Sequence, residues 1–101
     1  MSDIEKMQSR AVDIDDLYRP VEKTWGLREY TEGMVGDVGD LMKLAMAKSG
    51  LREKDNIDEG IEHEVNDIMW SLLMIYREIG KNPVESFMDA MNQLESGITE
   101  K

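Results

Sequence analysis

Residues 61–79, IEHEVNDIMWSLLMIYREI, are the strongest indication of the fold. The apolar residues in this stretch recur every three or four positions, which is the period of an α-helix with one buried face. That face consists of Ile61, Val65, Ile68, Leu72, Ile75 and Ile79. Met69, Leu73 and Tyr76 widen the face beyond what one neighbouring helix would cover. We therefore expect a long helix that is either central in the fold or part of a subunit interface.

Two helices are predicted before this stretch. The first begins at a capping box formed by Ser2 and Glu5 and ends before Pro20. The second runs from about residue 28 to residue 48 and stops at Gly50, since glycine suits the left-handed position after a helix. The expected apolar face of the first helix is Ile4, Met7, Ala11, Ile14 and Tyr18. That of the second is Met34, Val38, Leu41 and Ala45.

A fourth helix is predicted after Gly80, which ends the third. Asn82 supplies a side-chain cap and Pro83 suits the first helical position, and the pattern fades at Gly97. The apolar residues of this last helix are Val84, Phe87, Met88, Met91 and Leu94. Short connections favour antiparallel neighbours, and a bundle buries four apolar faces at once. The expected fold is an all-α four-helix bundle that forms one domain over residues 1–101.

The composition limits which binding partners and which cellular compartment we expect. With 22 acidic residues, 12 basic residues and a net charge of −10, the surface repels a phosphate backbone, so polymeric nucleic acid is not an expected partner. A small anion can still bind where a divalent cation held by carboxylates reverses the local field. The sequence has no cysteine, no membrane-spanning apolar run and no signal-peptide pattern. We expect a cytoplasmic protein without membrane contact, short enough to gain from oligomerisation.

Two pairs of carboxylates occupy matched positions on the second and third predicted helices. Asp37 and Asp40 are three residues apart, and so are Glu64 and Asp67. Residues at this spacing share one helix face, so each pair points both carboxylates the same way. Each pair also borders the apolar face of its helix, so the pairs meet when the two helices pack. Four converging carboxylates repel one another unless cations neutralise them, and oxygen ligands favour Mg²⁺ or Mn²⁺ over zinc.

Three glycines surround the first carboxylate pair. Gly33, Gly36 and Gly39 each cost about 0.8–1 kcal/mol relative to alanine inside a helix. A kink or a late helix start would explain them structurally. The functional alternative is that the missing side chains leave room beside Asp37 and Asp40 for a ligand or a close helix.

Residues 33–43, GMVGDVGDLMK, followed by residues 63–73, HEVNDIMWSLL, resemble the MazG-like family. The signature of that family is E-x-x-E, a spacer, and E-x-x-D. Glu64 and Asp67 match its second half, whereas Asp37 and Asp40 stand where the family carries two glutamates. The similarity spans roughly residues 25–94. Because aspartate is one methylene shorter, the substitution puts substrate preference and activity in question.

The resemblance implies an all-α, MazG-like homodimer or homotetramer. It implies a Mg²⁺-dependent nucleoside triphosphate pyrophosphohydrolase, which releases a nucleoside monophosphate and pyrophosphate and so cleans the nucleotide pool. The metal ligands and catalytic residues would be Asp37, Asp40, Glu64 and Asp67, with Mn²⁺ as an alternative ion. Substrate-binding candidates are Trp25, Lys43 and Asn92. No residue is assigned as the general base.

Structural roles compete with Trp25 and Lys43 as substrate-binding residues. Trp25 suits stacking on a nucleobase, but an amphipathic tryptophan serves a core equally well. Lys43 fits a solvated lysine, and the lone His63 fits a surface residue. The rival for the whole chain is a helical oligomerisation or regulatory module of the same fold in which hydrolysis has been weakened or lost through the two aspartates.

Overall fold

The computed structural model describes residues 1–18, 25–50 and 56–99. These residues form four α-helices, and no strand occurs within them. The helices are α1 (Asp3–Tyr18), α2 (Leu27–Lys48), α3 (Ile57–Glu78) and α4 (Pro83–Thr99). The prediction of an all-α chain with four helices is confirmed. Across the described ranges, none of the helices combines the length and the apolar character needed to cross a bilayer.

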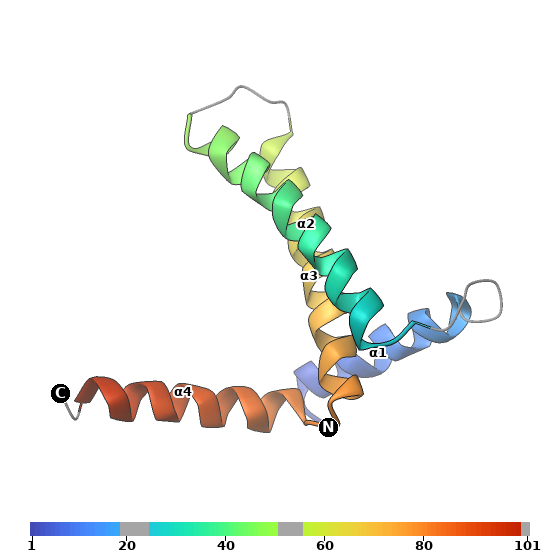
Figure 1. Cartoon of the computed structure of the whole chain (residues 1–101), viewed down its shortest axis with the longest axis vertical. Helices are drawn as coiled ribbons and strands as arrows, with labels where there is room; N and C mark the ends of the chain where they lie inside the picture. The colour runs from blue at the N-terminus through green and yellow to red at the C-terminus, as the bar shows by residue number, and fades with distance from the viewer. Residues whose placement is uncertain (19–24, 51–55, 100–101) are drawn as a thin grey trace.

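The helices form an angular arrangement around a central α3 (Figure 1). α2 and α3 pack side by side as an antiparallel hairpin, and α1 crosses the base of α3. α4 contacts α1 at this base and extends away from the hairpin, so the chain measures 51 × 41 × 25 Å. The third predicted helix is therefore central, because it contacts both α1 and α2.

The buried core lies where α1, α2 and α3 meet. Ala11, Tyr30, Leu73 and Met74 form its buried cluster, and Val12, Trp70 and Ile75 pack against it. Three rings meet edge to face beside this cluster. The ring centroids of Trp25 and Trp70 lie 5.8 Å and 5.4 Å from that of Tyr30. Such pairs add to the stability gained from apolar burial and fix the angle at which α2 meets α3.

A polar network ties the three helices together inside this core. The hydroxyl of Tyr30 donates to Asp15, which is only 4% exposed, over 2.7 Å. The guanidinium of Arg77 donates to the other carboxylate oxygen of Asp15 at 3.0 Å and to the Tyr30 hydroxyl at 3.2 Å. One residue comes from each of α1, α2 and α3, so the network sets their relative register.

The predicted helix ends are confirmed by specific hydrogen bonds and dihedral angles. The backbone of Ser2 donates to the Glu5 carboxylate at 2.9 Å, and the backbone of Glu5 donates to the Ser2 hydroxyl at 3.1 Å. Gly50 and Gly80 follow their helices with φ of 84° and 69°, the left-handed conformation that glycine adopts without steric cost. The side chain of Asn82 caps α4 by accepting from two backbone amides.

The apolar face predicted for the first helix is only partly confirmed. Ala11 is buried and Ile14 is half-buried, whereas Met7 and Tyr18 are 42% and 59% exposed and Asp15, outside the predicted face, is buried. Two polar contacts set the observed face. The Gln8 side chain donates to the Leu73 carbonyl at 3.1 Å, and the Trp70 indole donates to the Ala11 carbonyl at 3.2 Å. Hydrophobic periodicity does not detect such contacts. They shift the buried face of α1 from Met7 and Tyr18 toward Asp15.

The face predicted for the second helix is also only partly confirmed. Met34 and Leu41 are half-buried, whereas Val38 is 49% exposed and Ala45 is exposed, and the buried residues are Tyr30 and Leu44. α2 is nevertheless one continuous helix through its three internal glycines, so a late helix start does not explain them.

Candidate metal centre

Asp37 and Asp40 of α2 and Glu64 of α3 bring carboxylate oxygens together across the hairpin. One oxygen from each residue lies within 4.8 Å of the other two. The spacing of Asp37 and Asp40 puts both on one side of α2, and the antiparallel packing of α3 brings Glu64 opposite them. The structure thus joins three of the four predicted ligands in a cluster contributed by two helices.

Of the three carboxylates, that of Glu64 is the one with a buried oxygen and a shifted pKa. Its Oε2 is buried and has no hydrogen-bond partner in the described chain. Burial raises the pKa of Glu64, and the charges of Asp37 and Asp40 raise it further, while His63 lowers it. A buried acceptor without a donor costs free energy, so this oxygen is stabilised by a proton or a cation.

The donor set fits a hard divalent cation. Asp37, Asp40 and Glu64 offer only oxygen atoms, and Mg²⁺ and Mn²⁺ prefer oxygen ligands. Mg²⁺ is usually held by one or a few carboxylates and keeps several waters, so a partly open cluster suits it. Asp40 is exposed, and Asp37 and Glu64 are half-buried. The cluster therefore has both a buried oxygen and access from solvent.

Asp67, the fourth predicted ligand, lies outside this three-residue group. Its carboxylate lies 3.3 Å from Nε2 of His63, one turn earlier on α3. Asp67 still acts on Glu64 through its charge, because it contributes to the raised pKa of Glu64. The sequence alone indicates no role for His63 beyond that of a surface residue. The four-residue spacing of His63 and Asp67 on one helix was the signal that could have linked them.

Trp25 lies two residues before α2 begins, and its ring is beside Gly33, which shares a helix face with Asp40 two turns further on. Its ring is 37% exposed, contacts the ring of Trp70, and approaches the position where a Cβ on Gly33 would stand. Gly36 follows one turn later, and a Cβ there would meet nothing within 4 Å. From Gly33 to Asp40 is seven residues, about 10 Å along the helix. A strip without side chains thus runs from an exposed indole to the acidic cluster.

The two remaining substrate-binding candidates differ in their distance from the cluster. Lys43 is exposed and lies one turn after Asp40 on α2, near enough for its long side chain to approach a ligand there. Asn92 is exposed on α4, which extends away from the hairpin (Figure 1). Within one chain, the structure does not bring Asn92 to the acidic cluster.

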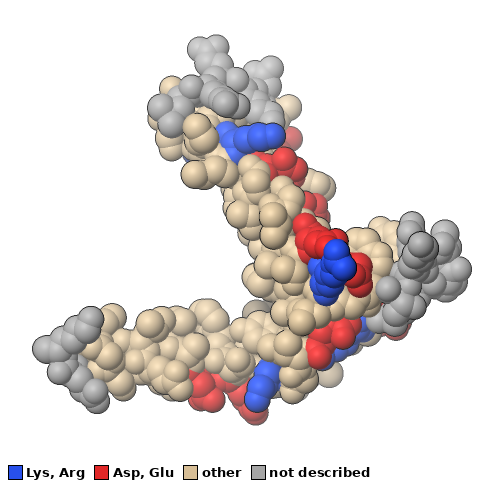
Figure 2. Space-filling model, viewed as in Figure 1, with Lys and Arg blue, Asp and Glu red and all other residues tan. Residues whose placement is uncertain are grey.

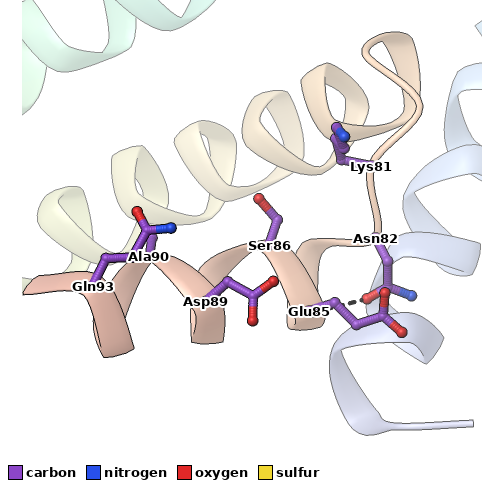
Figure 3. Close-up of a pocket in the computed structure, with 7 residues that line it drawn as sticks. All are labelled: Lys81, Asn82, Glu85, Ser86, Asp89, Ala90 and Gln93. Atoms are coloured by element: carbon purple, nitrogen blue, oxygen red, sulfur yellow. Dashed lines mark hydrogen bonds between the residues drawn. The ribbon is translucent and has the colours of Figure 1, made fainter.

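Charged side chains are unevenly distributed over the visible surface. In Figure 2 they gather along one edge of the α2–α3 hairpin and around the junction of the helices, and most of the remaining described surface in this view is tan, without charged residues. A polar groove of about 400 Å³ lies along α4 near this junction (Figure 3). It is lined by Lys81, Asn82, Glu85, Ser86, Asp89, Ala90 and Gln93. With two carboxylates instead of three, and with Lys81 beside them, this groove is a poorer metal site than the hairpin cluster.

Comparison of the chain with protein-family models, with curated proteins and with solved structures gives no match. The functional assignment therefore depends on the geometry of the hairpin and on the sequence motif it carries.

Proposed function

We propose that this chain is a Mg²⁺-dependent nucleoside triphosphate pyrophosphohydrolase of the MazG-like type, working as a homo-oligomer. The observation that carries the proposal is the convergence of Asp37, Asp40 and Glu64, whose carboxylate oxygens lie within 4.8 Å of one another. The buried Oε2 of Glu64, which has no hydrogen-bond partner in the described chain, supports it, because this oxygen can coordinate a cation.

Asp37, Asp40 and Glu64 would hold the cation, with Asp67 close enough to add negative charge. When bound, Mg²⁺ supplies charge neutralisation for a triphosphate and acidifies water. The protein itself determines where the carboxylates and the phosphates lie. Rigid helices fix the carboxylates, and the backbone of Gly36 leaves space beside them for phosphates.

The other side chains near the cluster suit a nucleotide in an extended pose. The exposed ring of Trp25 offers a stacking surface for a base, and about 10 Å of helix separates Gly33 beside that ring from Asp40. Lys43, one turn after Asp40, would meet the negative phosphates. Asp67 orients His63, whose ring nitrogens can hold or pass a proton beside the site.

The test is a panel of nucleoside triphosphates incubated with the purified chain and Mg²⁺ or Mn²⁺, with separate detection of pyrophosphate and inorganic phosphate. We expect at least one triphosphate to yield monophosphate and pyrophosphate in equal amounts. Glu64→Gln should abolish turnover while the helical circular dichroism stays intact. The matched control is Glu62→Gln, which neutralises an exposed carboxylate on the same helix and should leave turnover unchanged.

The same panel separates the enzyme from the helical-module alternative. Asp37 and Asp40 are shorter than the glutamates of the resembling family, which is the feature that favours the alternative. If no triphosphate yields pyrophosphate with either ion, the enzymatic proposal is wrong and the helical-module alternative is favoured. If Glu64→Gln remains active, the chain is an enzyme but its site is not the one assigned here.

A further inference from the structure

Trp25 lies outside the helices, yet the backbone beside it is held by the first turn of α2. The amide of the next residue, Gly26, donates to the Glu29 carboxylate at 2.8 Å. The carbonyl of Gly26 accepts from the amide of Tyr30 at 3.1 Å. These bonds satisfy groups at the start of the helix and fix the chain where it enters it. The indole of Trp25 therefore extends from a backbone of defined position.

Two other aromatic rings contact the indole of Trp25. The ring centroid of Tyr30 lies 5.8 Å from that of Trp25, and the centroid of Trp70 lies 6.4 Å from it. The ring planes of these two pairs are inclined at 60° and 65°, which is the edge-to-face geometry that aromatic pairs favour. A rotation of the Trp25 ring would lose contacts with both neighbours, so the two rings restrain its orientation.

Hydrogen bonds to α1 hold these two neighbouring rings in turn. Tyr30 is fully buried, and its hydroxyl donates to Asp15 at 2.7 Å. The indole N–H of Trp70 donates to the Ala11 carbonyl at 3.2 Å. Both bonds join residues from different helices, so each ring has a fixed place in the core. α1 carries none of the acidic cluster, but it supports the ring of Trp25 through these two residues.

The exposed part of Trp25 borders the strip of α2 that lacks side chains. Trp25 is 37% exposed, and a Cβ on Gly33 would lie 4.0 Å from its six-membered ring. From Gly33 the same helix face continues to Gly36 and Asp40. A nucleotide that lies along this strip with its phosphates at the acidic cluster would bring its base to an indole whose orientation is already fixed.

We propose that the site prefers purine nucleoside triphosphates, and that Tyr30 and Trp70 are positioning residues that set this preference by holding the Trp25 ring. The inference rests on the proposed function, because it names the substrate class of the same site. Indole and purine are both bicyclic, so they overlap over a larger area than indole and a monocyclic pyrimidine do. Stacking of a base on an aromatic side chain uses this overlap and does not read the hydrogen-bonding edge of the base.

The restraint on the Trp25 ring explains why its neighbours affect base binding. An exposed aromatic side chain that changes rotamer freely loses this freedom when a base stacks on it, and the loss weakens binding. In this chain the contacts with Tyr30 and Trp70 have already removed much of that freedom. Stacking at a distance from the bond that breaks is equally strong in the ground state and the transition state, so it changes KM more than kcat.

The first test measures nucleotide binding to the unmodified chain by calorimetric titration in the presence of Mg²⁺. The probes are adenosine and cytidine triphosphate analogues in which a methylene group joins the α- and β-phosphorus atoms, so that this linkage is not hydrolysed. We expect the adenosine analogue to bind about tenfold more tightly, which is within the range that stacking on an aromatic ring supplies. Equal affinities, or tighter binding of the cytidine analogue, would overturn the proposal.

Matched substitutions of Trp70 then test its positioning role. The chain has two tryptophans, so Trp70→Phe and Trp70→Leu each leave Trp25 as the only one. Trp70→Phe keeps a ring beside Trp25, whereas Trp70→Leu removes it. In the leucine variant we expect a lower fluorescence anisotropy of Trp25 and a preference for the adenosine analogue that is several-fold smaller than in the phenylalanine variant. The same anisotropy and the same preference in both would refute the role of Trp70.

Two further variants guard this comparison against a general loss of structure. Leu73→Ala removes apolar volume from the same core but none of the three rings, and it should keep the preference of the wild type. If Trp70→Leu lacks the helical circular dichroism of the wild type, Trp70→Met replaces it, because the longer side chain fills more of the space that the ring leaves. A Leu73→Ala variant that loses the preference as Trp70→Leu does would show that only the core matters, and would overturn the proposal.

Steady-state kinetics with ATP, GTP, CTP and UTP separate this inference from the proposed function. We expect the wild type to have lower KM values for the two purine nucleotides, with similar kcat values for all, and Trp70→Leu to bring the KM values together. Pyrophosphate release with equal KM for purines and pyrimidines would refute the inference and leave the proposed function intact. Absence of pyrophosphate with all of them, together with tighter binding of the adenosine analogue, would reject the hydrolysis and support the purine site.

Discussion

Asp37 on α2 and Glu64 on α3 present carboxylate oxygens within 4.8 Å of each other across the seam of the hairpin. The charge of Asp37 raises the pKa of Glu64, in addition to the larger effect of burial. Two like charges this close reduce the stability of the cation-free fold and favour a bound cation. The same contact thus links stability, pH and metal binding.

The raised pKa of Glu64 should make the stability of the chain depend on pH. The pKa of Glu64 is raised above its ordinary value of 4.5 in the folded chain, so the folded state holds the proton more tightly than the unfolded state. Its contribution to stability is fully present below about pH 4.5 and is lost as the pH rises through the folded pKa. In buffer with a chelator, we expect Glu64→Gln to melt increasingly above the wild type as the pH rises.

Paired thermal melts between pH 4 and pH 8 check this prediction. Glu62→Gln on the same helix is the control, and its difference from the wild type should not grow in the same way. A constant difference between the Glu64 variant and the wild type across this range would show that Glu64 carries no such constraint.

The buried network predicts the effect of removing one hydroxyl. Tyr30→Phe keeps the ring and its aromatic contacts but removes the 2.7 Å donor to Asp15. We expect the free energy of unfolding to fall by about 1–2 kcal/mol, because a buried charged acceptor loses a hydrogen bond. For a chain of this size each kcal/mol lowers the melting temperature by roughly 4–8 °C. Tyr18→Phe, at a side chain that is 59% exposed, is the control and should have little effect.

The glycines of α2 and α3 should respond to alanine in opposite ways. A Cβ on Gly39 meets nothing within 4 Å, so Gly39→Ala should stabilise the chain by about 0.8–1 kcal/mol. A Cβ on Gly60 would lie 3.2 Å from both methyl groups of Leu44, which is buried, so Gly60→Ala should lose that gain or destabilise the chain. Chemical denaturation of both variants measures the contrast, and equal stabilisation would disprove the packing assigned to Gly60.

Replacing Gly36 should change the stability and the activity of the chain in opposite directions. A Cβ there also meets open space, so Gly36→Ala should stabilise the helix as Gly39→Ala does. Gly36 lies on the same side of α2 as Asp40, whereas Gly39 points away from the seam. We expect Gly36→Ala to reduce pyrophosphate release several-fold and Gly39→Ala to leave it unchanged. Full activity in both variants would mean that the ligand does not use this space.

Local sequence signals were sufficient for the helices and their ends. The Ser2–Glu5 capping box, the glycines after α2 and α3, and the Asn82 cap each act through neighbouring residues, so they can be identified without tertiary structure. The convergence of Asp37 and Asp40 with Glu64 could be inferred as well, because three-residue spacing and antiparallel packing fix it.

The features that could not be predicted from the sequence depend mainly on contacts between residues far apart in the chain. The face of α1 is set by the bond from Trp70 to the Ala11 carbonyl and by the buried charge of Asp15, and neither follows from apolar periodicity. The direction of α4 depends on the bond from Asn82 to Glu5, which joins residues 77 positions apart. Asp67, one predicted ligand, lies outside the three-residue group and pairs with His63 instead.

The most direct test of the central claim is a calorimetric titration of the cation-free chain with Mn²⁺, repeated with Glu64→Gln, Asp67→Asn and Glu62→Gln. We predict that the wild type and the Glu62 variant bind with the same affinity and that the Glu64 variant binds about tenfold more weakly or worse. The Asp67 variant should show a smaller loss, since Asp67 lies outside the three-residue group. Absence of binding at millimolar Mn²⁺, or equal affinity in the wild type and the Glu64 variant, would contradict the account.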